Sequence, residues 1–80
     1  MVTVILSPRF EKMFKKIKHA SVKEHIILEI KMLKKNPELG KPMRFDRLGT
    51  RDVYISSFRL SYILEGDVIT LLDLYHKDEQ

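Results

Sequence analysis

Residues 53–75, VYISSFRLSYILEGDVITLLDLY, carry the strongest secondary-structure pattern in the chain. Apolar residues occupy every second position in this stretch, at 53 and 55 and then at 58, 60, 62 and 64, and the phase slips at Ser56-Ser57. Such alternation predicts strands with one buried face, and the slip predicts a turn or bulge between two strands. Glu65-Gly66-Asp67 predicts a hairpin turn, followed by a nearly continuous apolar strand over residues 68–75. The second half of the chain is therefore expected to form three consecutive strands.

The first half predicts a strand and two helices. Residues 2–6 are mostly β-branched, and Ser7-Pro8 supplies a helix N-cap followed by proline at the first helical position. Apolar residues spaced i, i+3, i+4 and i+7 from Phe10 predict an amphipathic helix that ends near Lys18. Residues 21–24, Ser-Val-Lys-Glu, match a capping box, which predicts a second helix from Val22 to about Lys35.

The predicted order is β-α-α-β-β-β. Two amphipathic helices must bury their apolar faces, so we expect a helical hairpin packed on one face of a mostly antiparallel four-stranded sheet. With 80 residues the chain is expected to be a single α+β domain over residues 1–80. The residues between the second helix and the sheet, 37–49, predict an irregular basic segment with a short extended piece at 43–45.

Composition excludes several function classes. The chain has no Cys, so disulfides, thiolate nucleophiles and cysteine-ligated metals are excluded, and its apolar runs are too short to span a bilayer. It is expected to be soluble and cytoplasmic. Residues 1–64 carry a charge of +8 and residues 65–80 a charge of −4, so the basic part is expected to attract polyanions or an acidic protein. His19 and His25 lie on separate predicted helices without a carboxylate cluster, so no metal site is expected. The sequence has no Gly-rich loop that could hold a phosphate, and no small-molecule cofactor is expected.

Motifs over almost the whole chain resemble the RelE/ParE superfamily of prokaryotic type II toxins. They are residues 7–12 (Ser-Pro-Arg-Phe-Glu-Lys) with the lysines after them, Asn36-Pro37 followed by residues 40–44 (Gly-Lys-Pro-Met-Arg), residues 58–62 (Phe-Arg-Leu-Ser-Tyr) and residues 74–77 (Leu-Tyr-His-Lys). The resemblance to RelE implies translation inhibition by ribosome-dependent mRNA cleavage, with an acidic antitoxin, the ribosome and mRNA as partners. The resemblance to ParE implies gyrase inhibition without catalysis. A third alternative is an inactivated toxin homologue that serves as a binding protein.

The mRNA-cleaving alternative gives a set of candidate residues. Metal-independent cleavage of RNA needs a base, cations at the charged phosphorane and a donor for the leaving oxygen. The candidates for these catalytic roles are Arg59, Tyr75, His76 and Lys77, and the candidates for binding RNA or the ribosome are Lys41, Arg44, Arg47 and Arg51.

The strand pattern also predicts the surroundings of Arg59. Arg59 is expected on the open face of the sheet, exposed, with pairing to Asp52 or Asp73 as the structural alternative. Asp52 departs from the family pattern, because the corresponding strand of ribonucleolytic relatives usually carries basic residues.

Overall fold

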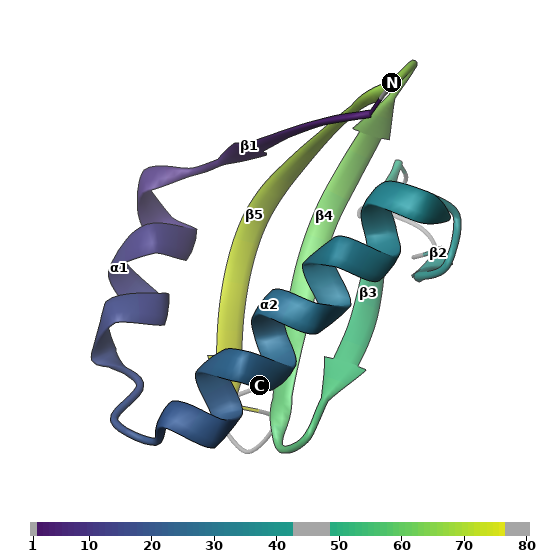
Figure 1. The fold of residues 1–80 in the computed structure, drawn as a ribbon. Helices are drawn as coiled ribbons and strands as arrows, with labels where there is room; N and C mark the ends of the chain where they lie inside the picture. Colours follow the sequence, from purple (N-terminus) through teal and green to yellow (C-terminus); the bar gives the residue numbers. More distant parts are fainter. Residues whose placement is uncertain (1, 43–48, 77–80) are drawn as a thin grey trace.

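The computed structural model describes residues 2–42 and 49–76. In chain order the elements are β1 (Thr3–Leu6), α1 (Pro8–Lys16), α2 (Ala20–Lys35), β2 (Lys41–Pro42), β3 (Thr50–Ile55), β4 (Phe58–Glu65) and β5 (Val68–His76). The strands form one sheet in the order β1-β5-β4-β3-β2, with both helices on the same face (Figure 1). β1 is parallel to β5, and every other neighbouring pair is antiparallel.

The predicted fold class is confirmed, and the sheet contains one strand more than predicted. The additional strand is β2, in which Lys41 and Pro42 pair with Asp52 and Arg51. The extended piece predicted at residues 43–45 lies outside the described residues. The turns predicted at Ser56-Ser57 and around Gly66 both occur, and Ser56 and Gly66 adopt positive φ angles of 54° and 62°.

The first helix begins as its sequence predicts, and the second does not. The Ser7 hydroxyl accepts a hydrogen bond from the Phe10 backbone N–H at 3.1 Å, as expected for an N-cap. The capping box predicted at residue 21 is not formed, because α2 begins at Ala20 and its N-cap, His19, makes no side-chain capping bond. The first turn closes on the His19 carbonyl, which accepts a hydrogen bond from the Lys23 N–H.

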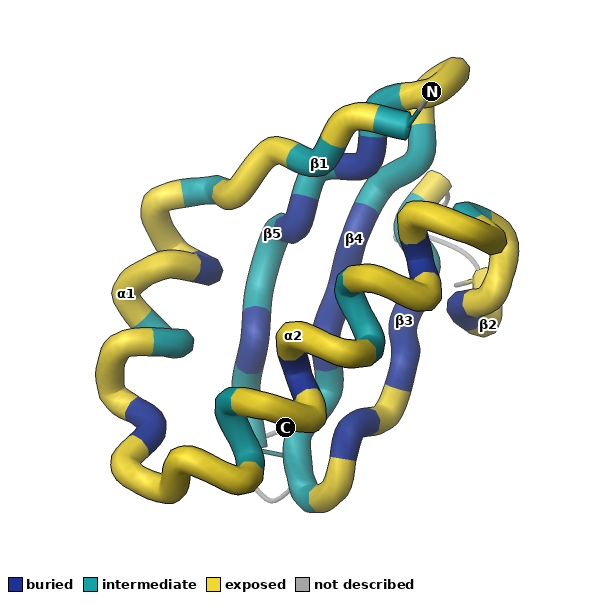
Figure 2. The backbone as a smooth tube through the Cα atoms, viewed as in Figure 1, coloured by how far each residue is buried: buried dark blue, intermediate teal, exposed yellow. Residues whose placement is uncertain are grey.

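The core lies between the helices and the sheet, where the buried segments of both layers face each other (Figure 2). α1 supplies one of its residues, the position after α1 another, α2 two more and the three long strands the others: Phe10, Ile17, Ile26, Leu33, Val53, Ile55, Leu60, Tyr62, Ile69, Leu71 and Leu74. The alternating apolar residues of β4 face the helices as predicted, and Leu60 and Tyr62 are fully buried. In the part of the chain that the structure describes, no helix is long and apolar enough to cross a membrane.

Tyr62 fixes the connection between α2 and the sheet. Its hydroxyl donates to the Pro37 carbonyl at 2.7 Å and accepts from the Gly40 N–H at 2.8 Å. A Cβ at Gly40 would lie 2.7 Å from the tyrosine ring and hydroxyl, so the backbone can approach this closely only at a glycine. Burial raises the pKa of Tyr62 above its ordinary value of 10.0, although the Gly40 hydrogen bond and Arg51 act in the opposite direction.

Candidate functional site

The helix-free face of the sheet carries a row of polar residues on its three long strands. The register pairs Asp52 of β3 with Ser61 of β4, and Ser61 with Asp73 of β5. The next row consists of Tyr54, Arg59 and Tyr75. Because side chains at paired positions point to the same face, six polar or aromatic side chains share this surface.

Arg59 forms a buried ion pair with Asp52. Its Nε atom contacts Asp52 Oδ2, and the two side chains are 14% and 0% exposed. Ser61 donates its hydroxyl hydrogen to the other carboxylate oxygen, Oδ1, at 2.8 Å. The guanidinium also lies 5.4 Å from the centre of the Tyr54 ring, which is a cation–π distance.

The predicted face of Arg59 is therefore confirmed, whereas its predicted exposure is wrong. The alternation in β4 fixes the face. The prediction of exposure fails because Asp52 and Arg59 lie on neighbouring strands and point to the same side. The Asp52 carboxylate therefore contacts the guanidinium and both side chains are largely buried. Pairing with Asp52, one of the two structural alternatives, is what the structure contains.

His76 lies on the opposite face from Arg59. It pairs in register with Phe58, and its ring meets the Phe58 ring edge-on with the centres 5.4 Å apart. Tyr75, one residue earlier, pairs with Arg59. Successive strand residues point to opposite faces, so the structure brings together Arg59 and Tyr75 but separates both from His76. Lys77, the fourth candidate for catalysis, lies outside the described residues.

The cations predicted to bind RNA have different surroundings. Lys41 is exposed on β2. Arg51 donates from Nη1 to the carbonyl oxygens of Glu38 and Gly40, at 3.2 and 2.9 Å, so it holds the segment after α2. Arg44 and Arg47 lie outside the described residues.

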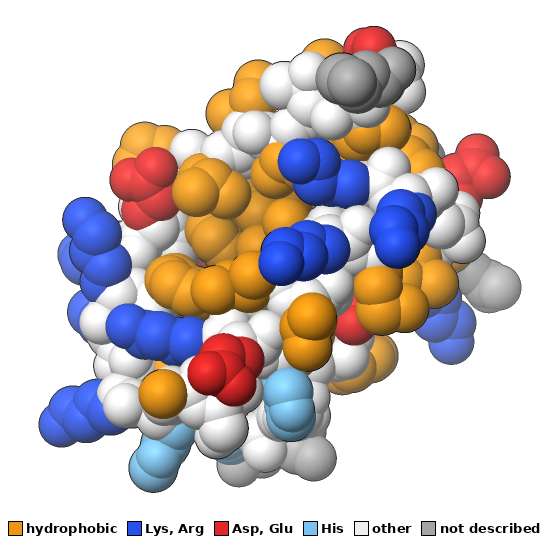
Figure 3. All heavy atoms as spheres, in the orientation of Figure 1, with side chains coloured by type: hydrophobic (Ala, Val, Ile, Leu, Met, Phe, Trp, Pro, Cys, Tyr) orange, Lys and Arg blue, Asp and Glu red, His pale blue; other side chains and the backbone are white. Residues whose placement is uncertain are grey.

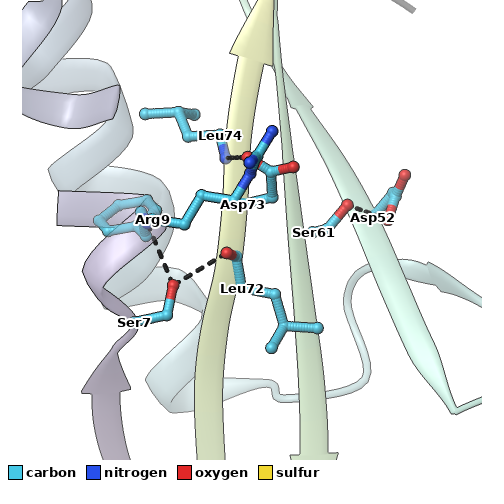
Figure 4. A network of polar contacts seen from close by, with 8 residues as sticks. Ser7, Arg9, Asp52, Ser61, Leu72, Asp73 and Leu74 are labelled. Carbon is cyan, nitrogen blue, oxygen red and sulfur yellow. Dashed lines mark hydrogen bonds and ion pairs between the residues drawn. The ribbon is translucent and has the colours of Figure 1, made fainter. Parts of the chain in front are cut away.

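A second ionic contact ties α1 to the sheet at the end of the polar row. Arg9 Nε lies 3.0 Å from Asp73 Oδ1, and that oxygen also accepts from the Leu74 N–H at 2.8 Å. The Ser7 hydroxyl, which caps α1, donates to the Leu72 carbonyl at 2.8 Å. Figure 4 shows Asp73 beside Arg9, with the Ser61–Asp52 pair on the next two strands. Ser61 had no predicted role, although polar residues at alternate positions of neighbouring strands indicate such a row.

The helical face differs from the sheet face in chemistry. Figure 3 shows apolar side chains gathered between α1 and α2, with Lys and Arg side chains around them. Near the α1–α2 connection, a pocket of about 460 Å³ is lined by Met13 of α1, Ile17 of the connection, Val22 of α2 and Phe58 of β4. Four basic side chains complete its lining: Lys16, Lys18, His19 and His76. Among the described residues, no three His, Asp or Glu side chains are grouped so that they could hold a metal ion.

Comparison with known proteins places the chain in one group of toxins. The family model described as "ParE toxin of type II toxin-antitoxin system, parDE" matches residues 4–80. No curated protein matches the sequence.

Solved structures with the same fold include two toxin–antitoxin complexes and the YoeB dimer. The RelBE2 complex of Mycobacterium tuberculosis matches with a TM-score of 0.82 and 20% identity, over 94% of this chain and 96% of that chain. The intact RelBE complex of Escherichia coli matches with a TM-score of 0.81 and 14% identity, over 95% of this chain and 96% of that chain. The YoeB dimer of Staphylococcus aureus matches with a TM-score of 0.79 and 20% identity, over 94% of this chain and 97% of that chain.

Proposed function

Since this chain belongs to the ParE toxin family of type II toxin–antitoxin systems, we propose that it acts by binding a macromolecular target and not by cutting mRNA. The observation that carries this proposal is the buried Arg59–Asp52 ion pair. The first target to test is DNA gyrase, which the resemblance to ParE implies. The partner that neutralises the toxin is an antitoxin, because similar folds occur in toxin–antitoxin complexes.

The energies favour binding over catalysis. To hold a scissile phosphate side-on through Nε and Nη together, Arg59 would have to leave Asp52, whose side chain is fully buried. An unpaired buried charge costs about 3 to 5 kcal/mol, whereas a hydrogen bond to a charged group contributes about 1.5 to 3 kcal/mol. Exchanging Asp52 for a phosphate is therefore unfavourable. The Asp52 carboxylate is also unsuited as a general base, because a base must come within hydrogen-bond reach of the substrate proton.

The position of His76 supports the same proposal. An acid or base and a phosphate-binding cation must reach one phosphate together. His76 packs against Phe58 on the helical face, and Arg59 lies on the other side of the sheet. The two candidates for RNA chemistry are thus separated by the backbone of β4 and β5.

The test uses a variant that removes the ion pair without leaving a buried charge, Asp52→Asn/Arg59→Gln. The purified toxin should inhibit supercoiling by gyrase, and the variant should retain that inhibition within about threefold, because Asp52 is fully buried and Arg59 is only 14% exposed, which leaves little of either to contact a target. Neither protein should produce new mRNA 5′ ends on programmed ribosomes. New 5′ ends from the unmodified chain, lost about a hundredfold in the variant, would refute the binding mode.

Ribosome-dependent mRNA cleavage is the second candidate. One observation favours it: Arg59 retains 14% exposure on a surface shared with Tyr54 and Tyr75. In that case neutralising Lys41, Arg44 and Arg47 together should weaken ribosome binding more at low salt than at high salt, because phosphate contacts act through counterion release. A chain that neither inhibits supercoiling by gyrase nor produces new mRNA 5′ ends would be an inactivated homologue.

A further inference from the structure

The connection between α1 and α2 is short and contains no residue that would break a helix. Residues 9–35 include no Gly and no Pro, so the sequence permits one helix from the start of α1 to the end of α2. The chain leaves the helix only at residues 17–19. Ile17 and His19 have φ angles of −72° and −85°, which a helix also uses, and ψ angles of 125° and 118°, which it does not. Rotation about a few ψ bonds would therefore join the two helices into one.

Little holds the chain in its present turn at this connection. His19, the N-cap of α2, makes no side-chain capping bond, and Lys18, His19 and Ala20 are all exposed. The connection also borders the pocket of about 460 Å³, so part of the turn lies over a hollow. In a continuous helix, carbonyl groups from the last turn of α1 would accept hydrogen bonds from the N–H groups of the first turn of α2.

The apolar faces of the two helices would point in opposite directions on a continuous helix. The residues that pack on the core form one stripe in each half: Phe10, Met13, Phe14 and Ile17, and then Val22, Ile26, Ile30 and Leu33. At about 100° per residue, the two stripes are centred roughly 165° apart. A single sheet covers only one of these faces. The other face would need a sheet on the opposite side, which a second molecule can supply.

The length of a continuous helix supports the same conclusion. A helix over residues 8–35 would be about 42 Å long, at about 1.5 Å per residue. The molecule measures 33 Å along its longest axis, so the α1 half would project beyond its own sheet. β1 would move with α1, because Ser7 alone joins them and both lie beside β5 (Figure 1).

β1 and α1 form a unit that is attached to β5. Among the described strands, β1 pairs with β5 alone. α1 packs mainly on the same strand, where Arg9 contacts Asp73 and the Ser7 hydroxyl bonds to the Leu72 carbonyl. These contacts join two separate stretches of the chain, residues 2–16 and β5. One copy of the chain can therefore supply the first stretch and another copy the second.

We propose that two copies of this chain exchange β1 and α1 and form a dimer in which α1 and α2 of each copy are one continuous helix. β1 of each copy then pairs with β5 of the other. The polar row on the helix-free face is completed between the copies, with Arg9 of one on Asp73 of the other. Monomer and dimer share the contacts to β5, so protein concentration decides which form is populated. The exchange does not depend on which target the toxin binds.

Ala20→Pro distinguishes the two forms. Ala20 is the first residue of α2, where proline is well tolerated, and His19 before it already has the extended backbone that a following proline favours. In a continuous helix residue 20 lies in the interior, where proline is disfavoured by about a hundredfold in each chain. After refolding from urea at high concentration, the unmodified chain should show a dimer in sedimentation experiments, and Ala20→Pro should fold as a monomer. The control Ala20→Ser should change the dimerisation constant by less than about tenfold, because a helix accepts serine.

A disulfide across the β1–β5 pair detects the exchange directly. The chain has no Cys, and Ile5 and Thr70 are register partners. Ile5→Cys in one chain and Thr70→Cys in another become neighbours only when β1 has been exchanged. Two such chains of different mass, refolded together, should form a mixed disulfide. In the control, Lys41→Cys at the opposite edge of the sheet replaces Ile5→Cys and should give only the random level of mixed disulfide.

Three outcomes would overturn the proposal. They are the absence of a dimer at high concentration, a dimer that Ala20→Pro forms as readily as the unmodified chain, and a mixed disulfide between residues 5 and 70 that does not exceed the Lys41→Cys control. If Ala20→Pro does not fold, the cysteine experiment decides by itself, because it leaves the α1–α2 connection unaltered.

Discussion

Replacing Arg59 by alanine should destabilise the fold strongly. The substitution leaves the Asp52 carboxylate, which is 0% exposed, with the Ser61 hydroxyl as the remaining contact described for it. Breaking a buried ion pair from one side costs about 3 to 5 kcal/mol. Eighty residues predict a total stability of roughly 4 to 12 kcal/mol. A loss of about 3 kcal/mol therefore removes a quarter or more of it and lowers Tm by roughly 12–24 °C.

The assay is urea unfolding followed by circular dichroism, applied to a double-mutant cycle. Asp52→Asn alone should cost less than Arg59→Ala, because the Arg59 side chain keeps 14% exposure and can turn toward water. Asp52→Asn/Arg59→Gln should recover most of the loss, since no buried charge remains. If Arg59→Ala stays within about 1 kcal/mol of the unmodified chain, as expected for an exposed site, the ion pair contributes little and does not exclude a catalytic role for Arg59.

Two further substitutions test how the helices are attached to the sheet. Tyr62→Phe should cost about 2 kcal/mol, because it leaves the Gly40 N–H and the Pro37 carbonyl without their partner. The raised pKa of Tyr62 means that the folded state holds this proton more tightly than the unfolded state. The contribution of the protonated Tyr62 hydroxyl to the free energy of unfolding is therefore fully present below pH 10 and falls as the pH rises further. In urea titrations at alkaline pH, the unmodified chain should lose more stability than Tyr62→Phe. Ser7→Ala should cost about 1 to 2 kcal/mol by thermal unfolding, since Ser7 both caps α1 and bonds to the Leu72 carbonyl. A change below about 0.3 kcal/mol would show that water replaces both bonds.

Local patterns along the chain predict both helices, four of the five strands and the buried face of β4, because these features depend on neighbours in the sequence. Ser7-Pro8 predicts the start of α1, since a cap acts on the next few residues. The period-two pattern from Phe58 to Leu64 predicts which side of β4 meets the helices, since alternate strand residues point to opposite faces. The two predicted turns lie where the chain must reverse between apolar segments.

Which polar side chains contact each other depends on the tertiary structure, through the register of the strands. Arg59 and Asp52 are close only because β3 and β4 pair in one register, and a shift by a single residue would place Asp52 on the helical face. The register of β4 and β5 likewise places Tyr75 beside Arg59 and His76 beside Phe58. Two adjacent residues of one sequence motif therefore lie on opposite faces of the sheet. Periodicity within a strand does not specify the register between two strands, because strand pairing depends on contacts between residues that are distant in the sequence.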